Sequence, residues 1–197
     1  MKRTAIVAMI LFLLSCKPSS KEKENINMNS PADRLIENDF LKYADSTEAE
    51  RLREALKTSF DIYDEKNYRI AVIDAEELAE LSFDFFLPAL NKILSKRDIE
   101  LIVETLPETE QTHDIMINKD TVRLFTDEEL RNGDFGDTAP RNFFKKVNQI
   151  LADKNSDERF YLLYGWNDLH AMLLTSKQQS IIAEYYKNKP KEVPYIP

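Results

Sequence analysis

The chain is poor in the residues on which several common kinds of active site depend. Its 197 residues include one cysteine, two histidines and three glycines. A single cysteine excludes an internal disulfide, and three glycines cannot furnish the usual glycine-rich phosphate loops. The sequence contains neither a G-x-S-x-G elbow nor an H-E-x-x-H motif. Elbow-type serine hydrolases, P-loop enzymes and the commonest zinc proteases are therefore excluded.

Cationic residues are in the minority, with 27 Lys and Arg against 35 Asp and Glu and a formal net charge of −8. This balance opposes binding to nucleic acid, which needs clustered cations. An acidic surface instead favours solubility or electrostatic attraction to a basic protein partner. Since 43% of the residues are apolar, the chain can build a core for one domain. We predict no nucleic-acid partner and no cofactor.

The longest apolar stretch lies at the N-terminus. Lys2 and Arg3 precede ten consecutive apolar residues, from Ala5 to Leu14. A membrane-spanning helix needs about 20 such residues, whereas this length and charge pattern are typical of a signal peptide. A buried amphipathic helix is the alternative, but the stretch has no polar face. We therefore predict a signal peptide over residues 1–15.

The residues that follow the apolar stretch, Leu13-Leu14-Ser15-Cys16, resemble the lipobox of bacterial lipoproteins. A leucine three positions before the cysteine and a small residue directly before it fit that pattern. The resemblance covers only the leader. It implies cleavage before Cys16, a diacylglycerol on the sulfur and a further acyl chain, such as palmitate, on the freed amino group. Two or more chains anchor a protein stably, at about 0.8 kcal/mol per buried methylene.

Residues 16–30 follow the predicted cleavage site and are rich in Lys, Glu, Ser and Asn. This composition is typical of a flexible tether. Lys17 stands where inner-membrane lipoproteins of enteric bacteria carry a retaining aspartate, so the resemblance implies anchoring at the outer membrane of the cell envelope. Loss of Lys2 and Arg3 leaves 25 basic against 35 acidic residues, a net charge of −10.

From residue 31 onward, helix and strand patterns alternate without a repeat or a low-complexity break. We predict one α+β domain over residues 31–189, in which an antiparallel or mixed sheet with hairpins packs against amphipathic helices. The clearest helix covers residues 139–153, where apolar residues follow a helical stripe. The expected strands are 68–73, 99–104, 113–118, 121–126, 159–164 and 169–175, with the last four forming two hairpins.

Three sequence patterns predict where helices begin. Capping boxes are present at Thr47-x-x-Glu50, Thr126-x-x-Glu129 and Ser176-x-x-Gln179. Residues 132–138 contain two of the three glycines and are expected to form a hinge-like loop. Three prolines make residues 190–197 an extended C-terminal tail.

Asp168 and His170 are the candidate catalytic residues. Two positions apart in a strand, they share one side, where a carboxylate can orient an imidazole for general-base catalysis. The alternative is that Asp168 caps a turn and His170 is an ordinary strand residue, because no nucleophile can be assigned. His113 and Asp114 have less support, since neighbouring strand residues point to opposite faces.

Two further groups are candidate binding residues. Asp134 and Asp137 offer hard oxygen ligands for Ca²⁺, but turn chemistry explains them without a metal and the EF-hand pattern is absent, so no metal is predicted. Trp166 stands beside Tyr164 and Asn167 at a predicted hairpin tip, as interface anchors often do. The alternative is that Trp166 folds back onto the core.

These patterns favour a lipid-anchored envelope protein that is not an enzyme and acts by binding a protein partner. An immunity or inhibitor protein is one version of this hypothesis. Two alternatives remain open: an envelope hydrolase that uses Asp168 and His170, and a structural or assembly lipoprotein. The sequence does not identify the partner.

Overall fold

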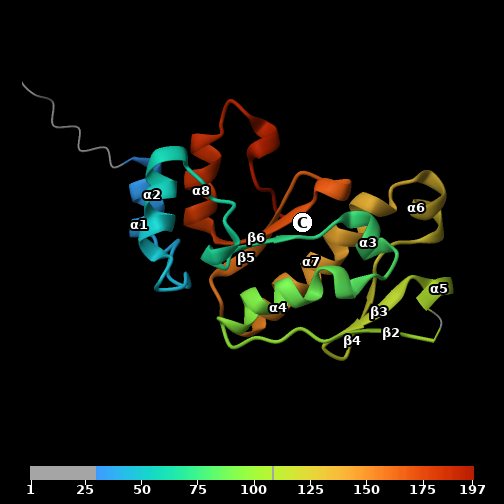
Figure 1. The fold of residues 1–197 in the computed structure, drawn as a ribbon. Coiled ribbons are helices and arrows are strands. Elements are labelled where there is room, and N and C mark those ends of the chain that lie inside the picture. The colour runs from blue at the N-terminus through green and yellow to red at the C-terminus, as the bar shows by residue number, and fades with distance from the viewer. Residues whose placement is uncertain (1–29, 108) are drawn as a thin grey trace, which may run out of the picture.

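A computed structural model describes residues 30–107 and 109–197 of the chain (Figure 1). The predicted signal peptide, Cys16 and all of the predicted tether except Ser30 lie outside the described residues. The α-helices are α1 (Pro31–Glu37), α2 (Ala49–Ser59), α3 (Ala75–Ala79), α4 (Leu87–Ser95), α5 (Thr109–Thr112), α6 (Asp127–Asn132), α7 (Phe135–Asp153) and α8 (Ser176–Tyr185). The strands are β1 (Ile70–Val72), β2 (Val103–Thr105), β3 (Asp114–Ile117), β4 (Asp120–Arg123), β5 (Glu158–Leu163) and β6 (His170–Thr175). Helices and two antiparallel sheets interleave along the chain, which confirms the predicted α+β class.

The first sheet has the order β1-β6-β5. Strands β5 and β6 form the predicted C-terminal hairpin, which closes with Leu163 opposite His170. Strand β1 occupies the other edge of β6 and pairs Ala71 with Ala171. The outer edge of β5 receives the tail, because Leu162 and Tyr195 exchange backbone hydrogen bonds.

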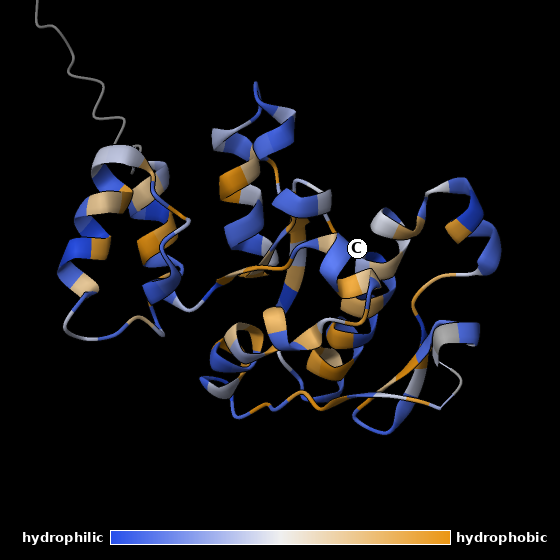
Figure 2. Ribbon diagram, turned by 45° about the vertical axis from the view of Figure 1, so that its right-hand side comes forward, coloured by the Kyte–Doolittle hydropathy of each residue, from blue (hydrophilic) through white to orange (hydrophobic). Residues whose placement is uncertain are grey.

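Helices cover both faces of this sheet, and the alternation of side chains along β6 separates two apolar clusters. Ala171 and Leu173 belong to the larger cluster, with α3, α4 and α7. Met172 and Leu174 belong to the smaller cluster, with α1, α2 and α8. Figure 2 shows apolar positions on the strands and on the inward sides of these helices. Strand β6 therefore contributes to two cores at once.

The second sheet has the order β2-β3-β4 and lies beyond α4 and α7 (Figure 1). Its β3–β4 hairpin turns at Asn118 and Lys119, whose φ angles of 47° and 77° suit a two-residue turn. Ile115 and Ile117 point from β3 into the larger cluster. The two sheets thus share one core.

Only one of the predicted capping boxes is where the sequence pattern placed it. Thr126 and Glu129 cap α6 reciprocally, as predicted. The prediction at Thr47 is wrong, because a turn from Asp45 runs directly into α2 and no side chain caps that helix. The prediction at Ser176 is wrong by one residue.

The α8 box is formed instead by Thr175 and Gln178. Both Thr175-x-x-Gln178 and Ser176-x-x-Gln179 fit the capping pattern, so spacing alone does not decide between them. Strand β6 continues to Thr175 and fixes it opposite Glu158. The register of the sheet therefore selects the cap.

The predicted hinge at residues 132–138 is also wrong. Helix α6 ends at Asn132 and is capped by Gly133 in a left-handed conformation, with φ of 79°, and α7 begins at Phe135, four residues before the predicted start. Gly136 is buried inside this helix, and a Cβ placed on it would lie 2.8 Å from Cζ3 of Trp166. This glycine permits close packing and does not act as a hinge.

A buried ionic cluster fastens the segment after α1 to the sheet. Arg69, 1% exposed, places Nη1 2.6 Å from Oε1 of Glu158, and Arg97 places Nε 2.8 Å from Oε2 of the same carboxylate. Arg69 also donates to the backbone carbonyls of Asp39 and Phe40. One carboxylate thus holds two arginines, which leaves one net positive charge in the cluster.

Candidate functional site

The turn between β5 and β6 brings together all five residues that the sequence singled out near residue 166. Its backbone is unusual, because Tyr164 and Trp166 have φ angles of 61° and 52°. This left-handed conformation destabilises a non-glycine residue by about 1 kcal/mol. A 3-10 helix, η3 (Trp166–Asp168), follows at once. The positive φ angles of Tyr164 and Trp166 therefore direct their side chains differently from those of residues in regular strand conformation.

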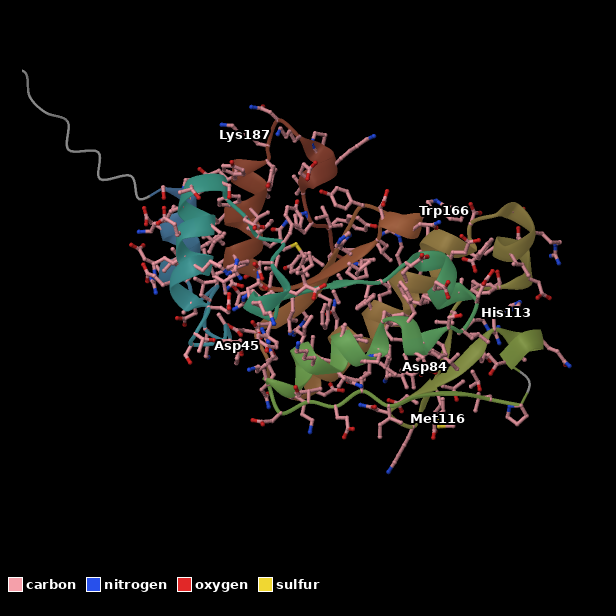
Figure 3. All side chains as sticks on the ribbon, viewed as in Figure 1. Asp45, Asp84, His113, Met116, Trp166 and Lys187 are labelled. Carbon is pink, nitrogen blue, oxygen red and sulfur yellow. The ribbon has the colours of Figure 1, made fainter. Side chains whose placement is uncertain are left out.

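Trp166 is 51% exposed. The sequence left open whether it is an exposed anchor or packs onto the core, and the structure shows part of each. Its six-membered ring lies against Gly136, and the rings of Trp166 and Phe135 meet edge to face with centroids 6.0 Å apart. Ring contacts continue from Phe135 to Phe125 and from Phe125 to His113. The other part of the indole is in solvent on the side of the molecule that also carries His113 (Figure 3). Trp166 is therefore an exposed side chain in a fixed orientation.

Acidic side chains stand on the elements that meet this indole. Helix α3 packs against both η3 and α7. Four exposed carboxylates on or beside these elements are those of Glu76, Glu80, Asp134 and Asp168, whereas the exposed Asp137 of α7 pairs with Arg141. Within residues 30–107 and 109–197, none of the four makes an ion pair. Unpaired carboxylates create a negative potential that attracts basic groups.

A groove of about 610 Å³ opens beside the same turn, between the hairpin and the C-terminal tail. It is lined by Tyr164, Gly165, Asp168, His170, Pro190, Lys191, Val193 and Tyr195. Apolar walls with a few convergent polar groups are typical of binding sites. The described lining offers no serine or threonine hydroxyl and no thiol.

His170 lies in this groove, but Asp168 orients it differently from the prediction. His170 Nδ1 is 2.7 Å from the backbone carbonyl oxygen of Asp168. Because a carbonyl only accepts hydrogen bonds, Nδ1 carries the hydrogen, and in the neutral ring Nε2 is left as the acceptor. The predicted carboxylate–imidazole pair is thus replaced by a carbonyl–imidazole pair.

A tyrosine network fixes the tail beside the groove. Glu192 Oε2 accepts hydrogen bonds from the hydroxyls of Tyr164, at 2.5 Å, and Tyr63, at 3.1 Å. Burial, followed by the hydrogen bond with Tyr164, raises the pKa of Tyr63. Burial and the bond to Glu192 likewise raise the pKa of Tyr164. Both hydroxyls therefore stay protonated near neutral pH.

Sequence reasoning missed Tyr63, Glu192 and Tyr195. They approach the turn from segments that are far apart along the chain, so no local spacing connects them. Tyr195 donates from its hydroxyl to the carbonyl of Tyr164 at 3.2 Å. The only local indication was the proline-rich composition of the tail, which predicted an extended course; the tail instead begins with a 3-10 helix, η4 (Pro190–Glu192), before Tyr195 pairs with Leu162.

The other candidate residues from the sequence lie outside the groove, and three of them interact with different side chains. His113 Nε2 is 3.2 Å from Asp127 Oδ1, whereas Asp114 pairs with Arg123. Asp137 pairs with Arg141 inside α7, and Asp134 precedes that helix. Among the described residues no group of three or more His, Cys, Asp or Glu side chains is placed to hold a metal ion.

Comparisons of the chain with protein-family models, with curated proteins and with solved structures found no match. Within the described part of the chain, no helix combines the length and apolar character needed to cross a membrane.

Proposed function

We propose that this protein is a lipid-anchored protein of the bacterial envelope that binds another protein through the surface around Trp166. The main support for this binding surface is the half-exposed indole of Trp166, which packs against Gly136 and Phe135 in one orientation. Aromatic anchors that are fixed before binding lose little conformational entropy when they enter a partner's pocket. Asn167 beside it is exposed and supplies polar contacts.

The charges around Trp166 define the partner's chemistry. The four unpaired carboxylates stand on or beside η3, α3 and α7, so the complementary surface is an apolar pocket with basic residues around it. A toxin neutralised by an immunity or inhibitor protein fits this description, and so does a basic component of an envelope assembly. Binding of this type weakens as salt rises.

The binding proposal is tested with the full chain in detergent, incubated with envelope extract of the producing bacterium. Trp166→Ala is compared with Phe85→Ala, a matched control because Phe85 is also an exposed aromatic, at 58%. We expect the unsubstituted chain and Phe85→Ala to retain one basic protein at low salt, and Trp166→Ala to lose it. Equal retention by all three chains would count against the Trp166 surface.

The anchor is proposed from the resemblance of residues 13–16 to a lipobox. Replacing Cys16 by Ala removes the only sulfur that can carry diacylglycerol. We expect palmitate labelling and sedimentation with membranes in the parent chain, and loss of both in Cys16→Ala. A Cys16→Ala chain that still incorporates palmitate would refute lipidation at this residue.

The second candidate function is an envelope hydrolase, and one observation favours it. His170 lies in the groove with Nδ1 fixed by a carbonyl, which leaves Nε2 available as a general base. Such an enzyme would activate water directly, because the described lining holds no hydroxyl or thiol nucleophile of the common kinds. Hydrolysis of generic ester substrates that disappears in His170→Ala would support it, and unchanged background rates would reject it.

A further inference from the structure

A second pocket lies away from the Trp166 surface. It encloses about 840 Å³ between the segment that follows α1, the C-terminal end of α4, the α7–β5 turn and the start of α8. Asp45, the ion-pair partner of the lining residue Lys96, stands on the opposite side of the molecule from Trp166 (Figure 3). The cavity and the Trp166 surface are therefore separate sites.

The buried arginine pair contributes to the wall of this cavity. Arg69 and Arg97 both line it, and each guanidinium carries five N–H donors. Four donors of each are used by Glu158 and by backbone carbonyls. One Nη2 hydrogen on each arginine has no acceptor within the described chain. Tyr43 backs Arg97, with its ring centroid 3.8 Å from the guanidinium carbon.

The charge of the cavity is opposite in sign to that of the chain. Its cationic residues are Lys42, Arg69, Lys96, Arg97, Lys154 and Lys177. Its acidic residues are Glu37, Asp39, Asp98, Asp157 and Glu158. The lining therefore has one excess positive charge, whereas the chain carries −8. Among the described residues, Lys154 and Lys177 make no ion pair.

We propose that this cavity binds a small ligand that carries a single phosphate group. Lysine ammonium groups are common recognition groups for phosphate oxygens, and the remaining N–H of each arginine offers a further charged donor. The acidic residues of the lining repel a long polyanion, so the site suits a compact ligand and not a nucleic acid. Free phosphate, a soluble phosphate ester and a phospholipid headgroup share this chemistry.

The test uses the full chain in detergent micelles and isothermal titration at neutral pH. The free probes are inorganic phosphate and glycerol 3-phosphate, each compared with sodium chloride at equal ionic strength. The lipid probe is phosphatidylglycerol in mixed micelles, compared with phosphatidylcholine. Lys154→Ala combined with Lys177→Ala removes two exposed cations from the lining without disturbing an ion pair.

The matched control combines Lys145→Ala with Lys187→Ala, two exposed lysines outside the cavity. Lys187 lies at the far end of α8 from the cavity (Figure 3). Loss of a charge-assisted contact weakens binding roughly tenfold or more. We expect such a loss in the cavity variant and none in the control.

Each outcome bears on the proposal. Binding of the free probes alone identifies a soluble ligand, and binding of phosphatidylglycerol alone identifies a headgroup; both support a phosphate site. Heats that match those of sodium chloride, or equal weakening in the cavity variant and the control, overturn it. Trp166→Ala should bind phosphate as the parent chain does, so this proposal and the protein-binding proposal fail independently.

Discussion

At the scale of single residues, Gly136 determines where the indole of Trp166 can lie. An alanine here gains helix propensity, up to about 1 kcal/mol. Its Cβ, however, would stand 2.8 Å from the indole ring, which must move. We expect Gly136→Ala to change the free energy of unfolding by no more than about 1 kcal/mol, while the displaced indole becomes more exposed.

Fluorescence measures this displacement directly, because Trp166 is the only tryptophan. The emission maximum of Gly136→Ala should shift to longer wavelength. Gly165→Ala is a suitable control, because a Cβ placed on Gly165 would meet no neighbouring atom within 4 Å. An unchanged spectrum in Gly136→Ala would show that the indole does not rest on this glycine.

The carboxylate of Glu158 has the largest expected effect on stability. It is 5% exposed and holds Arg69 and Arg97. Removal of its charge leaves two buried arginines without a counter-charge, and breaking a buried ion pair in this way costs about 3–5 kcal/mol. We expect Glu158→Gln to lower the urea midpoint accordingly. Asp114→Asn breaks the more exposed pair with Arg123 and should cost less than about 1 kcal/mol.

The same carboxylate predicts how stability depends on pH. Burial raises the pKa of Glu158, but the hydrogen bond from Arg97 and the charges of Arg69 and Arg97 outweigh it and hold the pKa below its ordinary 4.5. Stability from a lowered pKa is present above the ordinary value and is lost as pH falls through the lowered one. Below pH 4.5 the free energy of unfolding should therefore fall more steeply in the parent chain than in Glu158→Gln. Parallel slopes would contradict this.

The sequence predicted the prominence of Trp166 and His170, because aromatic and imidazole groups beside a turn are informative by type alone. It could not predict the partners that give them a function. Gly136 is 30 positions from Trp166, and Glu192 is brought to Tyr164 by the course of the tail. Such contacts depend on tertiary packing, which local spacing does not encode.

At the scale of elements, the helix caps distinguish competing predictions. Thr175 caps α8 through its hydroxyl, whereas neither Ser176 nor Thr47 caps a helix in the described part of the chain. We expect Thr175→Ala to cost about 1 kcal/mol. Ser176→Ala and Thr47→Ala should each change stability by less than about 0.5 kcal/mol. Thermal unfolding of the three variants checks this, and a larger loss in Ser176→Ala than in Thr175→Ala would favour the sequence-based assignment.

The sequence predicted the presence of elements that have a strong local pattern, but it predicted the residues at which they begin and end less accurately. The β3–β4 hairpin follows from alternating apolar residues around a two-residue turn, and the β5–β6 hairpin follows from two apolar runs around a glycine-containing turn. Helix α7 begins four residues before its apolar stripe, because Phe135 and Gly136 are held by Phe125 and Trp166. Periodicity detects the stripe but not these distant contacts.

At the scale of the molecule, the C-terminal tail completes the first sheet. Leu162 and Tyr195 exchange two backbone hydrogen bonds of 2.7 and 2.8 Å, and Glu192 accepts from two tyrosines. With about 1 kcal/mol for each bond, deletion of residues 190–197 should cost about 2–4 kcal/mol. Faster hydrogen exchange at the Leu162 amide would accompany a lower melting temperature. Lys191→Ala keeps these bonds and should melt with the parent chain.

The class of the fold was predictable from alternating helix and strand patterns, but the arrangement of its layers was not. The pairing of Ala71 with Ala171 joins positions one hundred residues apart. No local propensity specifies such a partner. Tertiary burial on both faces of β6 selects the observed order.

The position of β6 also governs when the chain can fold. A ribosome delivers β1 long before β6, yet both apolar clusters contain residues of β6 and remain open until it arrives. Long-range pairing of this kind is slow to form. Neither cluster can close before β6 is synthesised, so we expect the native fold to form only when nearly the whole described chain is available.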